Sequence, residues 1–326
     1  MVLKLQNDFL SAAPSVNLKR RAALLKTLRA FFDIRGFTEV QTPVLSRDTI
    51  IDRHLDPIEV PMQLPGGKAE NWFLQTSPEQ SMKRLLCSDI GSIYQVGPVF
   101  RSGELGRFHN PEFTMAEWYD LNASFEEGLV FLSDLISELL LTPVADRIRF
   151  EEAFRFATKL DLFECSTKDL AEWSVANGLV ERTDWSQDWD DWVNLIFSDQ
   201  VQGNLGIDRP VLVTHFPASQ AALARVSASD TRTAERYEAF YQGVELANGY
   251  HELLDADQLE ARARKSNEQR KADGKQELPM QNRLLDAMRS GMPSSCGCAM
   301  GFDRIVMLAC QAGSLDQVVA FTALNA

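Results

Sequence analysis

The sequence lacks any long hydrophobic run, and this absence limits where the chain can work. Nowhere among its 326 residues do about 18 apolar residues follow one another, roughly the length that a helix needs to span a bilayer. The N-terminal segment MVLKLQNDFLSAAPSVNLKRR has no apolar core between its charges, so it does not resemble a cleaved secretion signal. We therefore expect a soluble, cytoplasmic protein with no membrane partner.

Positive charge is also in short supply. The chain has 33 Lys and Arg against 46 Asp and Glu, a formal net charge of -13. A protein that docks a polyanion over a broad surface needs the opposite balance, because phosphates are bound by clustered cations. We therefore expect no tRNA or other nucleic acid as a partner.

Cysteine is scarce, and its five copies are scattered and odd in number. They do not form a disulfide framework, which fits a reducing compartment. Cys296 and Cys298 have no second Cys/His pair nearby at zinc-finger spacing, so we expect them to be structural. No internal repeat or low-complexity linker interrupts the chain, and 45% of it is hydrophobic. We therefore expect a single domain over residues 1–326.

Hydrophobic spacing indicates which elements are present. Residues 18–34 carry apolar side chains at helical intervals and stop at Gly36, which predicts a helix with a glycine cap. Further helix is expected over most of 125–200, with an acidic solvated face at 185–192, and a solvated polar helix over 257–276. The predicted strands are 37–40, 92–101, 112–119, 211–216 and 241–253. This pattern indicates an α+β fold, an antiparallel sheet flanked by helices.

The predicted hairpin of 92–101 and 112–119 carries the first chemical signal. Arg101 ends an apolar strand, and Arg107 and His109 follow in a glycine-containing loop, so the three are candidate anion partners. On the returning strand, alternation places Glu117 and Tyr119 on one side with apolar neighbours. A carboxylate buried there must be paired or face a ligand. Either feature alone fits an exposed hairpin with a surface ion pair, but together they indicate a binding site.

The segment FRSGELGRFHNPEFTMAEWY, at the end of residues 94–119, resembles motif 2 of the class II aminoacyl-tRNA synthetases, and its HNPEFTM part resembles the lysyl branch. Residues 19–45 resemble motif 1, the helix and strand at the family's dimer interface, and GCAMGFDRIVML within 297–309 resembles motif 3. TSPEQSMKRLL at 76–86 is similar to the substrate loop of lysyl enzymes. The resemblance covers nearly the whole chain, and it implies the class II fold and a homodimer.

The resemblance also implies ATP as a substrate, Mg²⁺ as its metal and a role for particular residues. Arg101 would hold the α-phosphate and the substrate carboxylate, where charge develops during the reaction. Arg304 would contact the far phosphates, Asn110 would lie along the nucleotide, and Glu245 would bind Mg²⁺ and ATP. The other residues that it implies for ATP are Ser102, Gly103, Glu104, His109, Leu246 and Gly301.

By the same resemblance, Glu79, Glu117 and Glu252 would surround the two amines of a lysine-like substrate. That many inward carboxylates would repel one another without a dicationic guest. The other residues implied for the amino acid are Ser77, Pro78, Tyr119, Asn248, Tyr250 and Ala299. Alternation puts residues 248, 250 and 252 on one face, whereas Glu245 is offset by three from Asn248. A bulge is therefore needed if all point inward, and Gly249 could ease it.

The chain also departs from the lysyl synthetases. Motif 1 begins within about twenty residues of the start, so we expect no room for their N-terminal anticodon-binding barrel. Ala299 stands where they have glycine, and one methyl group at a substrate site can redirect selectivity. Gly103 stands where many class II enzymes have the glutamate that recognises adenine, and Glu104 is the candidate replacement. Activation is expected to be retained and the acceptor to have changed.

These departures, with HFPASQA at 215–221 and GVELANGYHEL at 243–253, resemble a group of lysyl synthetase paralogues without the barrel that modify elongation factor P. The resemblance implies adenylation of (R)-β-lysine and its transfer to a specific lysine ε-amino group of elongation factor P. Two alternatives from other classes stay open. An AMP-forming ligase for another amino acid and a small amine would leave the acidic set without a purpose. An inactive regulatory module would not need to keep Arg101, Glu245 and Arg304.

Overall fold

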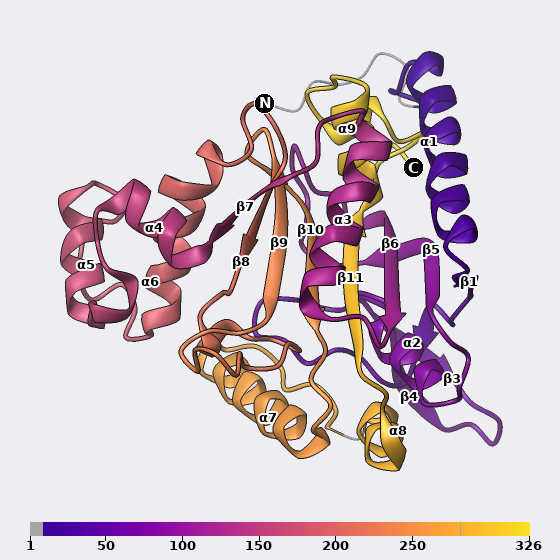
Figure 1. Cartoon of the computed structure of the whole chain (residues 1–326). Helices are drawn as coiled ribbons and strands as arrows, with labels where there is room; N and C mark the ends of the chain where they lie inside the picture. Colours follow the sequence, from indigo (N-terminus) through magenta and orange to yellow (C-terminus); the bar gives the residue numbers. More distant parts are fainter. Residues whose placement is uncertain (1–8, 281) are drawn as a thin grey trace. The chain divides into compact units, whose positions relative to one another are not determined.

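The computed structural model describes residues 9–280 and 282–326 (Figure 1). Its contacts divide the chain into two compact units. Unit 1 comprises the described residues of Met1–Ala123 and Leu253–Ala326, and unit 2 comprises Ser124–Glu252. The single domain expected over the whole chain stays a prediction, and each unit is described by itself.

Unit 1 contains the predicted hairpin within a mixed sheet. Its strands lie in the order β1-β5-β6-β11, and β1 pairs with β5 in parallel while the other pairs are antiparallel. A smaller antiparallel sheet has the order β2-β4-β3. The strands of this unit are β1 (Thr38–Glu39), β2 (Leu45–Ser46), β3 (Glu59–Gln63), β4 (Ala69–Leu74), β5 (Ile93–Phe100), β6 (Glu112–Leu121) and β11 (Ser295–Gly301).

The helices of unit 1 include those of the segments that resemble motifs 1 and 3. They are α1 (Ser15–Ile34), α2 (Glu79–Leu86), α7 (Ala256–Ala272), α8 (Arg283–Gly291), α9 (Phe302–Ala309) and the short 3-10 turn Leu315–Gln317. Helix α1 ends before Gly36, whose φ of +77° suits glycine, as the sequence predicted. Arg21 of α1 lies 2.6 Å from Asp303 of α9, and Asp303 also accepts from the Thr114 backbone of β6 at 3.1 Å. This buried carboxylate therefore ties segments of motifs 1, 2 and 3 together.

Unit 2 combines a sheet with a group of helices. Its strands lie in the order β10-β9-β8-β7, and β7 and β8 are parallel while the other pairs are antiparallel. In Figure 1 the helices α4, α5 and α6 gather beside β7 and β8. The elements are α3 (Phe125–Leu140), β7 (Asp146–Arg149), α4 (Phe150–Thr158), α5 (Thr167–Ala176), α6 (Trp189–Ile196), β8 (Val211–Thr214), β9 (Arg236–Tyr241) and β10 (Val244–His251). Shorter helical turns are Leu162–Glu164, Phe197–Val201, Gln202–Asn204 and Ala218–Gln220.

Several predicted elements need correction. The strands are not purely antiparallel in either unit, because β1 pairs with β5 in parallel in unit 1, and β7 pairs with β8 in parallel in unit 2. The helix expected over 185–192 begins only at Trp189, and its Trp192 is fully buried. The polar helix α7 is not wholly solvated either. Arg270 is 3% exposed, and it donates to the backbone oxygens of Asp52 and Leu55 and to the Asp56 carboxylate.

Across residues 9–280 and 282–326, no helix combines the length and the apolar character needed to cross a bilayer.

Candidate active site

The predicted anion site begins where β5 ends. Arg101 closes the hairpin loop through its backbone, which donates to Pro111 O at 2.9 Å. Its guanidinium lies 5.0 Å from the centre of the Phe113 ring, 3.5 Å from Glu104 Oε1 and 3.4 Å from Thr76 O. These contacts are long, and the side chain is 23% exposed. The structure thus presents a half-buried cation that is supported by an aromatic ring.

The loop itself is anchored from a distant segment. Ser102 N donates to Asp56 O at 2.8 Å, and Asp56 is held by the buried Arg270 of α7 at 2.9 Å. Gly103 follows with a φ of +79°, which side chains rarely adopt, so glycine is required for the turn. Gly103 is the position at which many class II synthetases have the glutamate that recognises adenine, and in this chain it forms the turn. Glu104 instead lies beside Arg101, and its contact with adenine stays a prediction.

Arg304 and His109, which were both predicted to bind ATP, lie next to each other at the start of α9. Gly301 is the N-cap of this helix, and Arg304 Nη2 lies 2.8 Å from His109 Nε2. Arginine can only donate, so His109 Nε2 is the acceptor in this contact. The name cationic loop site is used below for Arg101, His109 and Arg304. Arg107 is directed elsewhere, because its Nε donates to Gly313 O at 2.6 Å.

Asn110 has a structural setting. It is 6% exposed, its amide nitrogen donates to Glu112 O at 2.6 Å, and its amide oxygen accepts from Ala323 N at 3.0 Å. Both ends of the side chain thus bind backbone. Its predicted place along the nucleotide stays a prediction.

A buried acidic cluster lies at the start of α2 and on β6. Glu117 is 2% exposed, and its carboxylate accepts from Ser77 Oγ at 2.5 Å and from Tyr119 Oη at 2.7 Å. Ser77 Oγ also accepts from the Glu79 backbone at 3.1 Å, directly after Pro78. The side chains of Ser77, Glu79, Glu117 and Tyr119 were predicted for one site, and the structure brings them together. These four and Lys83 are called the acidic cluster below.

Sequence reasoning missed Lys83. Its ammonium lies 2.5 Å from Glu79 Oε1, and the residue is 2% exposed. The buried residues of α2 are Glu79, Met82, Lys83 and Leu86, which follow helical spacing. This periodicity was the available signal, since it places a lysine in a buried stripe next to the predicted substrate residue Glu79.

Burial is the main electrostatic influence on Glu117. Together with the neighbouring Glu79 carboxylate, it raises the pKa of Glu117 to about 8. The hydrogen bonds from Ser77 and Tyr119 and the charge of Lys83 act in the opposite direction. Near neutral pH the side chain therefore carries a proton that an incoming ammonium group can displace.

Ala299 lies in the same cross-strand row as Glu117. The register pairs Glu117 of β6 with Gln95 of β5 on one side and with Ala299 of β11 on the other. Directly opposed residues of antiparallel strands share a face, with their Cβ atoms about 5 Å apart. The Ala299 methyl group is therefore a neighbour of the Glu117 side chain, as its predicted role in substrate binding requires.

In unit 2, the predicted bulge in β10 is confirmed. Glu245 pairs with Phe240 but Ala247 pairs with Ala239, so Leu246 is the extra residue. Leu246 is 1% exposed. The offset of three residues between Glu245 and Asn248 is thus accommodated within the strand.

Beyond the bulge, Asn248 and Tyr250 share a face, as alternation predicted. Asn248 donates to Tyr250 Oη at 3.0 Å and accepts from Arg236 Nε at 3.3 Å. Gly249 faces the other way, where an added Cβ would lie 2.3 Å from the Tyr237 ring. Packing against this ring therefore requires the glycine. Glu252 ends the segment with 1% exposure, and its backbone oxygen accepts from Arg225 at 3.2 Å.

Sequence reasoning also missed the neighbouring strand β9. Arg236 forms an ion pair with Glu238, and the register places these residues opposite Tyr250 and Asn248. The alternation in RYEAFY was the available signal.

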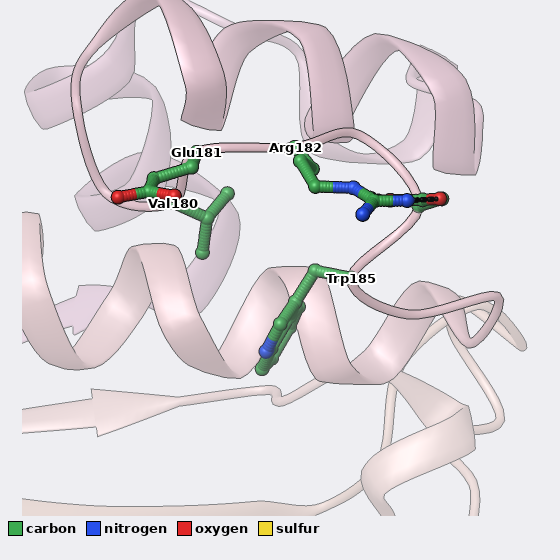
Figure 2. Close-up of a pocket in the computed structure, with 5 residues that line it drawn as sticks. Val180, Glu181, Arg182 and Trp185 are labelled. Carbon is green, nitrogen blue, oxygen red and sulfur yellow. Dashed lines mark hydrogen bonds and ion pairs between the residues drawn. The ribbon is translucent and has the colours of Figure 1, made fainter.

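A separate cavity of about 470 Å³ opens in the α5–α6 loop (Figure 2). Arg182 in the lining of this cavity forms an ion pair with Asp184, and the ring of Trp185 contacts the ring of Trp192 edge-on, with 5.0 Å between the ring centres. None of the predicted site residues lines it, and we assign it no chemistry. The lining residues are Val180, Glu181, Arg182, Asp184 and Trp185.

Comparison with known proteins agrees with the motifs. The family model of tRNA synthetases class II (D, K and N) matches residues 4–325. A protein of Salmonella arizonae named elongation factor P–(R)-β-lysine ligase is 41% identical over 307 residues, 94% of each chain. One of the same name from Klebsiella pneumoniae is 41% identical over 312 residues, 95% of this chain and 96% of the relative. With these motifs, this α+β fold and a match along nearly its whole length, the chain belongs to the D, K and N family of class II tRNA synthetases.

Proposed function

We propose that this chain is an ATP-dependent, AMP-forming ligase that activates (R)-β-lysine and transfers it to a lysine ε-amino group of elongation factor P. The observation that carries this proposal is the match to relatives with that name, at 41% identity over at least 94% of their lengths. The acidic cluster supports it, because buried carboxylates suit a substrate with more than one amine.

In the first step, a carboxylate oxygen of the amino acid attacks the α-phosphorus of ATP. The bond from that phosphorus to the bridging oxygen breaks, and pyrophosphate leaves. Arg101 would stabilise the charge that develops on the α-phosphate, and Arg304 would contact the departing phosphates. His109 Nε2 lies 2.8 Å from Arg304 Nη2 and so supports the side chain that would make this contact.

The predicted Mg²⁺ would be held by Glu245 of unit 2. Its carboxylate is a hard oxygen ligand, placed beside the β10 bulge. When bound with ATP, Mg²⁺ would neutralise phosphate charge, and the phosphates would supply further oxygen ligands. A site that depends on the nucleotide in this way needs few protein carboxylates. Among the described residues, no group of three or more His, Cys, Asp or Glu side chains is placed to hold a metal ion.

In the second step, the neutral ε-amine of the acceptor lysine attacks the carbonyl carbon of the adenylate. The carbon–oxygen bond to AMP breaks, AMP leaves and the new amide nitrogen loses a proton. The adenylate is a mixed anhydride and already reactive, so positioning of the amine supplies most of what this step requires. We place the reaction in the cytoplasm, since the free cysteines fit a reducing compartment.

The test uses two linked measurements. Pyrophosphate exchange into ATP should depend on (R)-β-lysine, and intact mass spectrometry should then show one added residue on elongation factor P. Parallel incubation with tRNA should give little charged product. Exchange without any dependence on a diamino acid would refute the substrate assignment, and efficient tRNA charging with unmodified elongation factor P would refute the acceptor.

We also propose a homodimer through α1, on the likeness of residues 19–45 to motif 1. Sedimentation at micromolar protein should show twice the chain mass of 36.6 kDa. A strictly monomeric species would contradict this assembly.

A further inference from the structure

Lys83 is a fully buried lysine beside the carboxylates that are predicted to bind the substrate amines. It is 2% exposed, on the same stripe of α2 as Met82 and Leu86. A lysine is almost never buried to this extent unless it is paired. Its ammonium lies 2.5 Å from Glu79 Oε1 and 5.8 Å from the centre of the Tyr119 ring. The pair spans one helical turn, so the backbone of α2 holds both side chains.

The Glu79 carboxylate is held at one oxygen only. Oε1 bonds to Lys83, whereas Oε2 has no hydrogen-bond partner among the residues that the structure describes. The Glu79 backbone nitrogen donates to Ser77 Oγ, which in turn donates to Glu117. Lys83 therefore sets the direction of the Glu79 carboxylate, while Ser77 links the backbone of Glu79 to the Glu117 carboxylate.

Lys83 also affects the net charge of the acidic cluster. Among the side chains named in the acidic cluster, the two carboxylates of Glu79 and Glu117 and the one ammonium group of Lys83 carry one net negative charge when both carboxylates are ionised. A ligand that supplies one ammonium group balances this charge.

We propose that Lys83 is a positioning residue for substrate recognition: it holds Glu79 through Oε1, so that Oε2 is available to an ammonium group of the substrate. This inference rests on the proposed function, in which the substrate is a diamino acid. It assigns Lys83 no contact with the substrate. Its effect passes through Glu79, and it should therefore change amino acid binding rather than use of ATP.

A pH signature accompanies this role. Within unit 1, Glu117 is faced by Glu79 and Lys83 from α2 and by Tyr119 on its own strand. Burial and Glu79 raise the pKa of Glu117, and Lys83 lowers it. Without Lys83 the carboxyl should ionise at higher pH. The acid limb of kcat/KM for the amino acid should then move to higher pH, which loss of packing alone would not cause.

The primary variant is Lys83→Met, which keeps most of the side-chain volume and removes the charge. We expect its KM for (R)-β-lysine in pyrophosphate exchange to rise by about 30- to 100-fold, the low end of the scale for removing one partner of a buried charge pair. The KM for ATP and the rate at saturating amino acid should stay within about threefold, because uniform substrate binding is what is lost. An unchanged amino acid KM, or an unchanged acid limb, would overturn the proposal.

Two variants on α2 serve as controls. Arg84→Met removes an exposed cation from the same helix, and Leu86→Ala destabilises the same buried stripe without changing charge. Both should leave the amino acid KM within about twofold, as surface changes and uncharged packing defects outside a site do. A rise in KM for Leu86→Ala as large as that for Lys83→Met would assign the effect to packing and overturn the proposal.

Loss of one partner of a buried pair also destabilises the fold. If Lys83→Met does not fold, Glu79→Gln is compared with Glu79→Gln/Lys83→Met. Since Lys83 acts through Glu79, the amino acid KM of the double variant should exceed that of Glu79→Gln by less than about twofold. A further increase of about 30-fold or more, as expected for two independent effects, would overturn the proposal. Calorimetric titration of the wild-type protein with (R)-β-lysine separates a failure of the proposed function from a failure of the role of Lys83. No binding there refutes the substrate, whereas normal wild-type binding with an unaffected Lys83→Met refutes only the role of Lys83.

Discussion

The acidic cluster and the cationic loop site are built in opposite ways. The cluster lies on a helix and a central strand, and its Glu117 and Lys83 are each 2% exposed, with bonds of 2.5 to 2.7 Å. The cationic site lies on a loop and a helix start, where Arg101 is 23% exposed and its polar contacts span 3.4 to 3.5 Å. One site is thus organised by the fold, and the other leaves its cation half in water.

This difference fits the ligands that we propose for the two sites. Amines at different positions on a short chain are distinguished by fixed geometry, which needs buried carboxylates that hydrogen bonds hold in place. A triphosphate brings several charges, and its cations must strengthen their contacts as the transition state forms. Predictions that disturb one site and spare the other sharpen this contrast.

The largest effect is expected from Arg101→Ala. The fold should be kept because the side chain is partly exposed, whereas pyrophosphate exchange should fall by about a hundredfold or more through loss of a preorganised charge. Arg107→Ala is the matched control, since this arginine lies in the same loop but donates to Gly313 O. Near-normal exchange by Arg101→Ala, or an equal loss in the control, would contradict the assigned role.

Glu117→Gln should disturb the acidic cluster alone. The shape of the side chain is kept, but the charge that we propose to bind an ammonium group is lost, so the KM for the amino acid should rise by about a hundredfold while the KM for ATP is unchanged. Glu112→Gln, at an exposed position on the same strand, is the control. Steady-state exchange at varied amino acid and varied ATP checks both constants. A comparable rise in the KM for ATP would mean that the two sites are not separable.

The same variant tests the electrostatics without any substrate. The folded-state pKa of Glu117, about 8, lies above its ordinary value of 4.5, so the folded protein binds this proton more tightly than the unfolded chain. The group's stabilising contribution is therefore present below about pH 4.5 and is lost as pH rises toward 8. Melting temperatures between pH 5 and about 9 should show Glu117→Gln gaining on the wild type as pH rises. A difference that is independent of pH would contradict the raised pKa.

The hairpin and the bulge could be predicted because their signals are local. Alternation along 112–119 placed Glu117 and Tyr119 on one face, and the offset between Glu245 and Asn248 required an extra residue in β10, which is Leu246. Strand β11 was not predicted as a strand, because SCGCAMG contains few of the β-branched and aromatic residues that favour one. Its place beside β6 depends on tertiary pairing.

Lys83 escaped prediction for a related reason. A lysine on a short polar helix is normally solvated, and only the partner at Glu79 makes its burial possible. Arg270 shows the same effect in α7, where buried bonds to the backbone oxygens of Asp52 and Leu55 replace the solvent that the sequence predicted. Residue type and spacing describe one element at a time, whereas both of these residues are defined by what lies opposite them.

The smallest predicted effect is a change of selectivity at Ala299. Its methyl group stands opposite Glu117 in the β6–β11 register, at a position that is glycine in the lysyl synthetases that the chain resembles. In α-lysine the amine is on the carbon next to the carboxylate, and in β-lysine it is one carbon further away. The two isomers therefore need different free space beside the amine-binding carboxylates.

If the Ala299 methyl group crowds the α-amine, Ala299→Gly should raise kcat/KM for α-lysine relative to (R)-β-lysine by about tenfold, the low end for one methylene-sized misfit. Use of ATP should be unchanged, because the cationic loop site is untouched. Cys298→Ala is the control, since this buried neighbour on β11 is opposite Trp118 and faces away from Glu117. An unchanged ratio in Ala299→Gly would locate selectivity in the carboxylates themselves, because attraction to the amines would then act without steric exclusion.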